Sequence, residues 1–212
     1  MRRVFGDQGG QSAEVLSIFH SWRRVSRTAL ACTRFASHRE IQRDMPHRVD
    51  QETFERLLPL ACRWARAQEE LILAYGHSLS ARQSSDAFQV GVQNWGRIRL
   101  LIVDRIPVPD HAELAEVAGR TQILTPASRA FALGYGIIVR ADSWGDRELL
   151  LHNFVHVAQC ERAGGLEQWV RQYLSDRLTC DDFSLGNFEN EARSIAREIC
   201  AGEIGVTERV NQ

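Results

Sequence analysis

The stretch LLLHNFVHVAQCERAGG, residues 149–165, decides the fold around it and carries the most informative pattern in the chain. It is an apolar run that ends in two glycines, and Asp146 and Glu148 precede or open it, as is typical of a helix N-terminus. His152 and His156 are four residues apart, slightly more than one helical turn, so both side chains project from one face. Two imidazoles at this spacing can bind one zinc ion, as in the H-E-x-x-H motif. The spacing is equally typical of two half-buried histidines, so both interpretations stay open on this pattern alone.

A third metal ligand is expected on a later helix, because a catalytic zinc site uses three protein ligands and leaves a position for water. Glu191 lies beside the apolar stripe of the helix expected over residues 187–202, and we predict it as that ligand. Glu189 is the second choice, and a solvated glutamate is the plain alternative. Cys160 continues the histidine face, but it is about 12 Å from His152 along the helix axis and is therefore predicted to be a packed thiol.

The order of elements predicts an α+β fold, with a long helix first, a small sheet next and three helices last. The first helix is expected over residues 50–76, with Asp50 as its N-cap, Gly76 as its stop and a kink or a new start near Pro59. The other expected elements are a strand over 98–103, a helix over 110–119 capped by Asp110, strands over 121–124 and 130–142, and helices from about 144 to 163, over 166–178 and over 187–202.

Composition places the chain among ordinary globular proteins and argues against several partners. The net charge is −1, with 44% hydrophobic and 25% charged residues, so nucleic acid is not expected as a partner. No apolar run approaches the roughly 20 residues of a transmembrane helix, so no membrane is expected either. All 26 basic residues are arginine, which excludes mechanisms that need a lysine amine. The 5 cysteines are scattered without a C-x-x-C pair, which favours a cytoplasmic location.

The chain divides, by this interpretation, into a basic N-terminal arm at residues 1–44 and a domain at residues 45–212. The arm is rich in arginine and can be read as a basic amphipathic helix. A targeting segment, a disordered arm, and sequence upstream of a start at Met45 are three interpretations that stay open.

The C-terminal half, from about residue 98 to residue 200, resembles zincin-like metallopeptidases whose third zinc ligand is glutamate. It is most similar to small bacterial proteins with the pattern H-E-x-V-H-x-A-Q-x-E-R-x-G-G, then R-Q-Y-L and E-x-E-A. The matching residues are His152, Val155, His156, Ala158, Gln159, Glu161, Arg162, Gly164, Gly165, Trp169, Arg171, Gln172, Tyr173, Leu174, Glu189, Glu191 and Ala192. The resemblance implies a zinc ion, a peptide or protein as substrate or partner, and a small twisted sheet with an active-site helix and flanking helices. Its edge strand, expected at residues 136–140, would run beside an extended substrate.

Asn153 departs from this pattern, because it stands where the family has its general-base glutamate. Asparagine cannot take a proton from zinc-bound water at neutral pH, so hydrolysis is expected to be impaired while metal binding survives. The departure is a natural loss, a base supplied from elsewhere, or an engineered inactivation. Glu148 is a candidate substitute base.

Three further side chains are candidates for supporting roles around the predicted metal. Tyr173 is a candidate donor to a substrate oxyanion, although a tyrosine on an amphipathic helix is more often a packing residue. Asp176 or Asp181 is a candidate to orient a histidine through its second ring nitrogen.

The function predicted from the sequence is therefore that of a zinc-binding, metallopeptidase-like protein, impaired or inactive as a protease. The alternative is a non-catalytic interaction or regulatory domain built on a zincin frame. A plainer possibility is an α+β domain without a metal.

Overall fold

The computed structural model describes residues 49–179 and 186–210, which belong to the second of two compact units, Pro46–Gln212. The predicted arm at residues 1–44 lies outside the described residues, so the proposed division of the chain stays a prediction. The helices are α2 (Gln51–Tyr75), α3 (Ala81–Gln89), α4 (Ala112–Arg120), α5 (Arg147–Ala163), α6 (Leu166–Thr179) and α7 (Asn187–Val210). The strands are β1 (His77–Ser78), β2 (Arg99–Val103), β3 (Ala130–Leu133) and β4 (Gly136–Arg140). Short 3₁₀ turns lie at Trp95–Arg97 and Ala141–Ser143. The predicted α+β class is confirmed.

The four strands form one mixed sheet in the order β1-β2-β4-β3. The central pair, β2 and β4, is parallel, and β1 and β3 add antiparallel strands at the two ends. The expectation that residues 136–140 form the edge strand was wrong, because β4 pairs on both sides. Its side chains from Gly136 to Val139 are all buried, as is typical of an interior strand.

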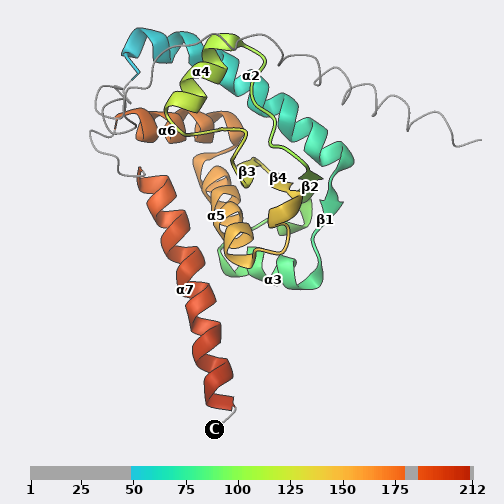
Figure 1. Ribbon diagram of the computed structural model, residues 1–212. Helices are drawn as coiled ribbons and strands as arrows, with labels where there is room; N and C mark the ends of the chain where they lie inside the picture. Colours follow the sequence, from blue (N-terminus) through green and yellow to red (C-terminus); the bar gives the residue numbers. More distant parts are fainter. Residues whose placement is uncertain (1–48, 180–185, 211–212) are drawn as a thin grey trace, which may run out of the picture. The chain divides into compact units, whose positions relative to one another are not determined.

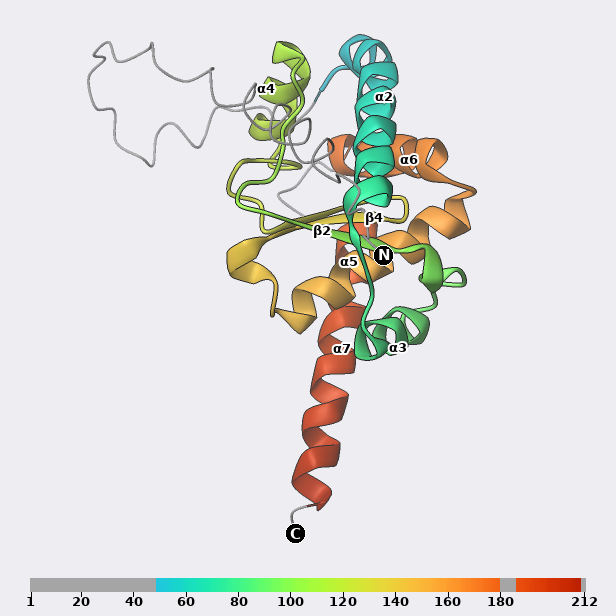
Figure 2. The ribbon, with the colours of Figure 1, turned by 90° about the vertical axis from the view of Figure 1, so that its right-hand side faces the viewer.

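Helices cover both faces of the sheet (Figure 2), with α2 and α4 on one side and α5 and α3 on the other. Alternate residues of β4 face the two layers. Ile137 and Val139 belong to the cluster that contains α5, whereas Ile138 packs with Ile72 of α2. Gly136 lets α2 approach, since a Cβ there would lie 2.9 Å from the Ile72 side chain.

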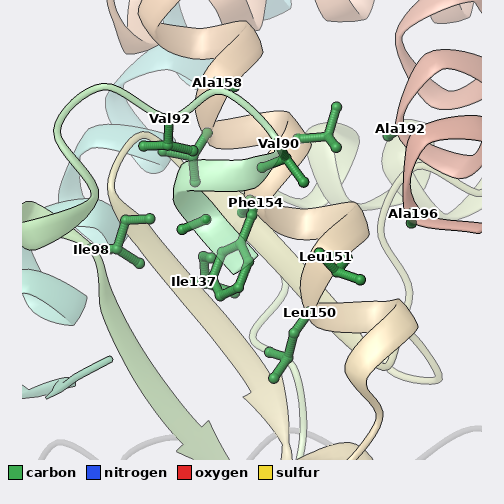
Figure 3. Close-up of a cluster of buried hydrophobic side chains, with 14 of the residues drawn as sticks. Val90, Val92, Ile98, Ile137, Leu150, Leu151, Phe154, Ala158, Ala192 and Ala196 are labelled. Carbon is green, nitrogen blue, oxygen red and sulfur yellow. The ribbon is translucent and has the colours of Figure 1, made fainter. Parts of the chain in front are cut away.

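The helix α5 is the centre of the larger core (Figure 1), lying between the sheet and α7. Asp146 caps its first turn by accepting a hydrogen bond from the Leu149 backbone N–H, and Gly164 ends it in the left-handed conformation with φ +89°. Figure 3 shows Phe154 of α5 among Ile137, Leu150 and Leu151. Every residue from Leu150 to Cys160 is buried except His152, so α5 is enclosed on nearly all sides.

The long first helix, α2, agrees with its prediction at both ends. Asp50 accepts a hydrogen bond from the Thr53 backbone N–H, and the helix runs through Pro59 as one element before it stops at Gly76. The weak pattern after Gly76 contains α3, which a capping box of Ser80 and Gln83 begins.

Two predicted elements between residues 110 and 142 were wrong in detail. His111, not Asp110, caps α4, and residues 121–124 form turns where a strand was expected. The strand expected over residues 130–142 is a hairpin, because Gly134 adopts φ +58° and the chain reverses between β3 and β4. Within the described residues, no helix has the length and apolar character needed to span a membrane.

The position of Phe154 gives a direct test of the core. Phe154→Ala is expected to lower the free energy of unfolding by about 3–5 kcal/mol, because a fully buried aromatic ring leaves a cavity. Phe88→Ala is the matched control, since that ring is 70% exposed and its loss is expected to change stability by less than about 0.5 kcal/mol. Urea unfolding of both variants measures the difference; equal effects would contradict this placement of α5.

Candidate metal centre

Three side chains converge on one point at the surface of α5. His152 and His156 come from α5 and Glu189 from the first turn of α7. The two histidine Nε2 atoms are 3.0 Å apart; that of His152 lies 3.3 Å from Glu189 Oε2, and that of His156 lies 3.3 Å from Glu189 Oε1. The structure therefore brings the second-choice glutamate, not Glu191, to the histidines.

These distances match those between the ligand atoms of one metal ion. Tetrahedral zinc with bonds of about 2.0–2.2 Å separates its ligand atoms by roughly 3.3–3.6 Å. The nitrogen–oxygen distances of 3.3 Å lie at the lower end of this range, and the nitrogen–nitrogen distance of 3.0 Å is a few tenths of an ångström shorter. The three residues can hold a metal ion without any rearrangement of the backbone.

Gln159 determines which ring nitrogen of His156 donates a hydrogen bond. Its amide Nε2 lies 2.9 Å from both the Phe188 carbonyl oxygen and the Glu191 carboxylate, and only an NH₂ group can donate to two acceptors. Its Oε1 therefore faces His156 Nδ1, at 2.8 Å, and that nitrogen must donate the hydrogen bond. The neutral His156 ring then carries its lone pair on Nε2, the atom that points at His152 and Glu189.

Glu191, predicted as the ligand, instead contacts Gln159, the residue that bonds to His156. It accepts from Gln159 and pairs with Arg162, whose Nη2 lies 2.6 Å from its Oε1. The carboxylate thus orients the amide that orients His156. Outer-layer partners of this kind set the direction and basicity of a metal ligand.

Tyr173 lines the cleft and contacts Glu189, and its role as a donor to a substrate oxyanion stays a prediction. Its hydroxyl donates to Glu189 Oε1 at 2.6 Å. Burial and the adjacent carboxylate raise the pKa of Tyr173 well above its ordinary value, so the hydroxyl keeps its proton. The Trp169 ring lies 4.9 Å from the Tyr173 ring and 5.8 Å from the His156 ring, centroid to centroid, and the three rings pack as one wall.

Glu189 is an anion at neutral pH. Burial on its own raises the pKa of this carboxyl, but the ring nitrogens of His152 and His156 and the Tyr173 hydroxyl outweigh burial and hold the pKa well below its usual range. A carboxylate and two ring nitrogens that face one another repel unless a proton or a cation lies between them. The three side chains are close enough to hold a metal ion.

A cleft of about 310 Å³ opens above the three side chains. The strand β3 and the loop before it form one wall, with Arg129 to Ala132 along the cleft, and Trp169, Tyr173 and Arg177 of α6 form another. Since β4 pairs with β3 on the far side, the strand beside the cleft is the real edge of the sheet. Sequence reasoning missed this strand because it treated residues 130–142 as one element.

Asn153 lines the cleft beside the histidines and is 2% exposed. Its amide Nδ2 donates to the Leu149 carbonyl oxygen of the preceding turn, at 2.8 Å. Among the described residues that line the cleft, Glu189 is the sole carboxylate. The candidate substitute base, Glu148, is not part of the lining; it lies 3.5 Å from Arg197 with half of its side chain exposed.

The remaining candidates have other surroundings. Asp176 accepts hydrogen bonds from the Phe188 backbone N–H and from Asn187, and so holds the start of α7 in place. Asp181 lies outside the described residues. Cys160 packs in the cluster between α2 and α6, where burial raises its pKa to about 12, so the predicted packed thiol is confirmed. The sequence also offered no role for Gln159 beyond its place in the motif.

Comparison with protein-family models, with curated proteins and with solved structures finds no match for this chain. The functional argument therefore depends on the geometry of the site and on the residues that form it.

The two glutamates of α7 separate a ligand from a supporting residue. Glu189→Ala is expected to abolish stoichiometric metal binding, because it removes one of the three converging atoms. Glu191→Ala, the matched control two residues away, is expected to retain binding with affinity about 10–100-fold lower, the usual cost of losing an outer-layer partner. Competition with a chromogenic zinc chelator measures both affinities; the reverse order of effects would contradict the assignment of Glu189.

Proposed function

We propose that this protein holds one zinc ion through His152, His156 and Glu189 and uses the site to bind a peptide segment, as a metallopeptidase-like protein impaired in hydrolysis. The observation that carries the proposal is the convergence of His152, His156 and Glu189 at the base of a cleft, where one ligand atom from each residue lies within 4.8 Å of the other two. Two imidazole nitrogens and one carboxylate oxygen form a donor set that suits zinc. Three protein ligands leave a fourth position that faces the cleft, as catalytic sites do and structural sites do not.

The ion, when bound, would supply a positive charge that polarises a carbonyl oxygen. The residues of the chain then have separate tasks. His152, His156 and Glu189 hold the ion, while Gln159 and Tyr173 keep His156 and Glu189 in their orientations.

An extended peptide is the ligand that the cleft fits best. The edge strand β3 lies along one wall, and an unpaired edge offers backbone N–H and carbonyl groups to an added strand. The position of β3 beside the metal ligands would place a carbonyl of such a peptide over the ion. This arrangement supports the resemblance to zincin-like peptidases in a coarse sense, through the ligand set and the adjacent strand.

Impaired hydrolysis follows from Asn153 and from the lining of the cleft. Hydrolysis needs a group that accepts a proton from the attacking water and passes it to the leaving amine. An amide cannot do this, and the only described carboxylate in the lining, Glu189, is committed to the metal position and to Tyr173. General acid–base assistance is worth about 10²–10⁴-fold in rate, so turnover is expected to be slower by that factor.

Metal content tests the site without any knowledge of a substrate. Protein purified without a histidine tag after growth with zinc is expected to carry close to one zinc per chain, and His152→Ala to carry close to none. Elemental analysis of both proteins gives the ratio directly. Equal zinc content in the two proteins, or none in either, would contradict the proposal.

Restoring the carboxylate tests whether the cleft positions a substrate. Asn153→Glu is expected to raise the rate of casein cleavage by about 10²–10⁴-fold over the unaltered protein, because glutamate supplies the missing proton acceptor. Asn153→Gln is the matched control, with the same length and no carboxylate. Zinc-loaded Asn153→Glu that cleaves no faster than Asn153→Gln would favour the alternative, a non-catalytic interaction domain on the same frame.

A further inference from the structure

Arg177 is a cleft-lining arginine that the sequence did not single out. It lies on α6 one turn after Tyr173, a rise of about 6 Å along the helix axis, and it lines the same cleft as the metal ligands. Tyr173 in turn contacts Glu189. The guanidinium therefore stands on the wall of the cleft at a short distance from the predicted ion.

No acid with a described side chain in residues 49–179 and 186–210 forms an ion pair with the guanidinium of Arg177. Its one hydrogen bond to a described residue runs from Nη2 to the Thr121 carbonyl oxygen, at 3.2 Å. Its Nε is buried and has no acceptor in the described part of the chain. A buried donor without a partner is costly, and a guanidinium without a counter-ion more so.

The second arginine of the cleft, Arg129, differs in this respect. Its Nη2 lies 2.6 Å from Asp146, and its Nε donates to the Ser143 hydroxyl at 3.0 Å. Its charge is thus paired with the residue that caps the N-terminus of α5. Of the two arginines that line the cleft, Arg177 is the one without an ion pair to a described acid.

The surroundings of Arg177 hold it in place for this task. Thr121 begins the turn between α4 and β3, and the next residue, Gln122, adopts the left-handed conformation with φ +56° although it is not glycine. Such a backbone persists only where the neighbouring structure enforces it, and it is common at ligand-binding sites. Gln122 also lines the cleft, so the strained turn and the arginine that bonds to it both border the cleft.

From this geometry we infer that Arg177 binds a carboxylate of the peptide ligand, so that the cleft takes an acidic peptide. A guanidinium fork is the protein group best matched to a carboxylate. The carboxylate is either the C-terminus of the bound peptide or an aspartate or glutamate side chain. The inference rests on the proposed function, since it assumes that the ligand reaches the metal and the arginine together.

Hydroxamates that differ only in charge test the inference on the full chain. The probes are the monohydroxamic acids of butanedioic, pentanedioic and hexanedioic acid, each paired with its neutral carboxamide, and the protein is loaded with Co²⁺ so that binding changes its visible spectrum. At least one acid is expected to bind roughly 10- to 100-fold more tightly than its carboxamide, the range for a hydrogen bond to a charged group. Arg177→Gln is expected to abolish this preference and to leave the affinity for the carboxamide unchanged.

Two controls separate the possible failures. Arg129→Gln is expected to keep the preference, because the charge of Arg129 is paired with Asp146. An equal affinity for acid and carboxamide in the unaltered protein, or a preference that survives Arg177→Gln, would overturn the inference while leaving the metal site intact. A protein that gives no cobalt spectrum would instead contradict the proposed function. Loss of carboxamide affinity in Arg177→Gln, with Arg177→Lys behaving alike, would assign Arg177 a structural role and overturn the inference as well.

The two sources of the carboxylate are distinguished with peptide hydroxamates. One probe ends in glycine with a free carboxylate, one ends in glycine amide, and one carries an internal glutamate before a blocked C-terminus. Whichever carboxylate probe binds more tightly than the amide in an Arg177-dependent manner identifies the source. Equal binding of all three would contradict recognition of a peptide carboxylate.

Discussion

The burial of α5 is the constraint from which the site follows. The helix is enclosed from Leu150 to Cys160, apart from His152, yet Asn153, His156 and Gln159 in that segment are polar. A buried polar group costs free energy unless it finds a partner inside the protein. Asn153 finds one in its own helix, whereas His156 and Gln159 bond to each other and then to α7 through the Phe188 carbonyl oxygen and Glu191.

The same chain of bonds connects packing to chemistry. The two acceptors on α7 force the Gln159 amide into one orientation, which gives His156 a proton on Nδ1 and a lone pair on Nε2. That lone pair meets a second imidazole and an anionic carboxylate within 3.3 Å. These internal hydrogen bonds hold His156 and Glu189 in orientations that, together with His152, could hold a metal ion.

Charge is distributed unevenly around the cleft. The described lining has one acid, which faces the metal position, and two arginines, one of which is already paired. Asn153 adds no charge where the resembling peptidases have a glutamate. The proposals of an anionic peptide ligand and of impaired hydrolysis both rest on this distribution of charge.

The sequence by itself determined the local structure. Local features depend on residues within a few positions of one another, so they can be recognised in the sequence. They include the caps at Asp50 and Gly76, the helix end at Gly164 and the shared face of His152 and His156. It also determined the α+β order and the packed state of Cys160.

Only the tertiary structure decided which glutamate meets the histidines and which strand borders the cleft. Glu189 and Glu191 are two residues apart, so their directions around α7 differ by about 160°, and the choice depends on how α7 docks against α5. Similarly, the apolar run of β4 is read as a strand from its residues, but its interior place depends on the turn at Gly134 and on pairing with the distant β2. Helix docking and strand pairing are set by contacts between residues far apart in the chain, and no local pattern records them.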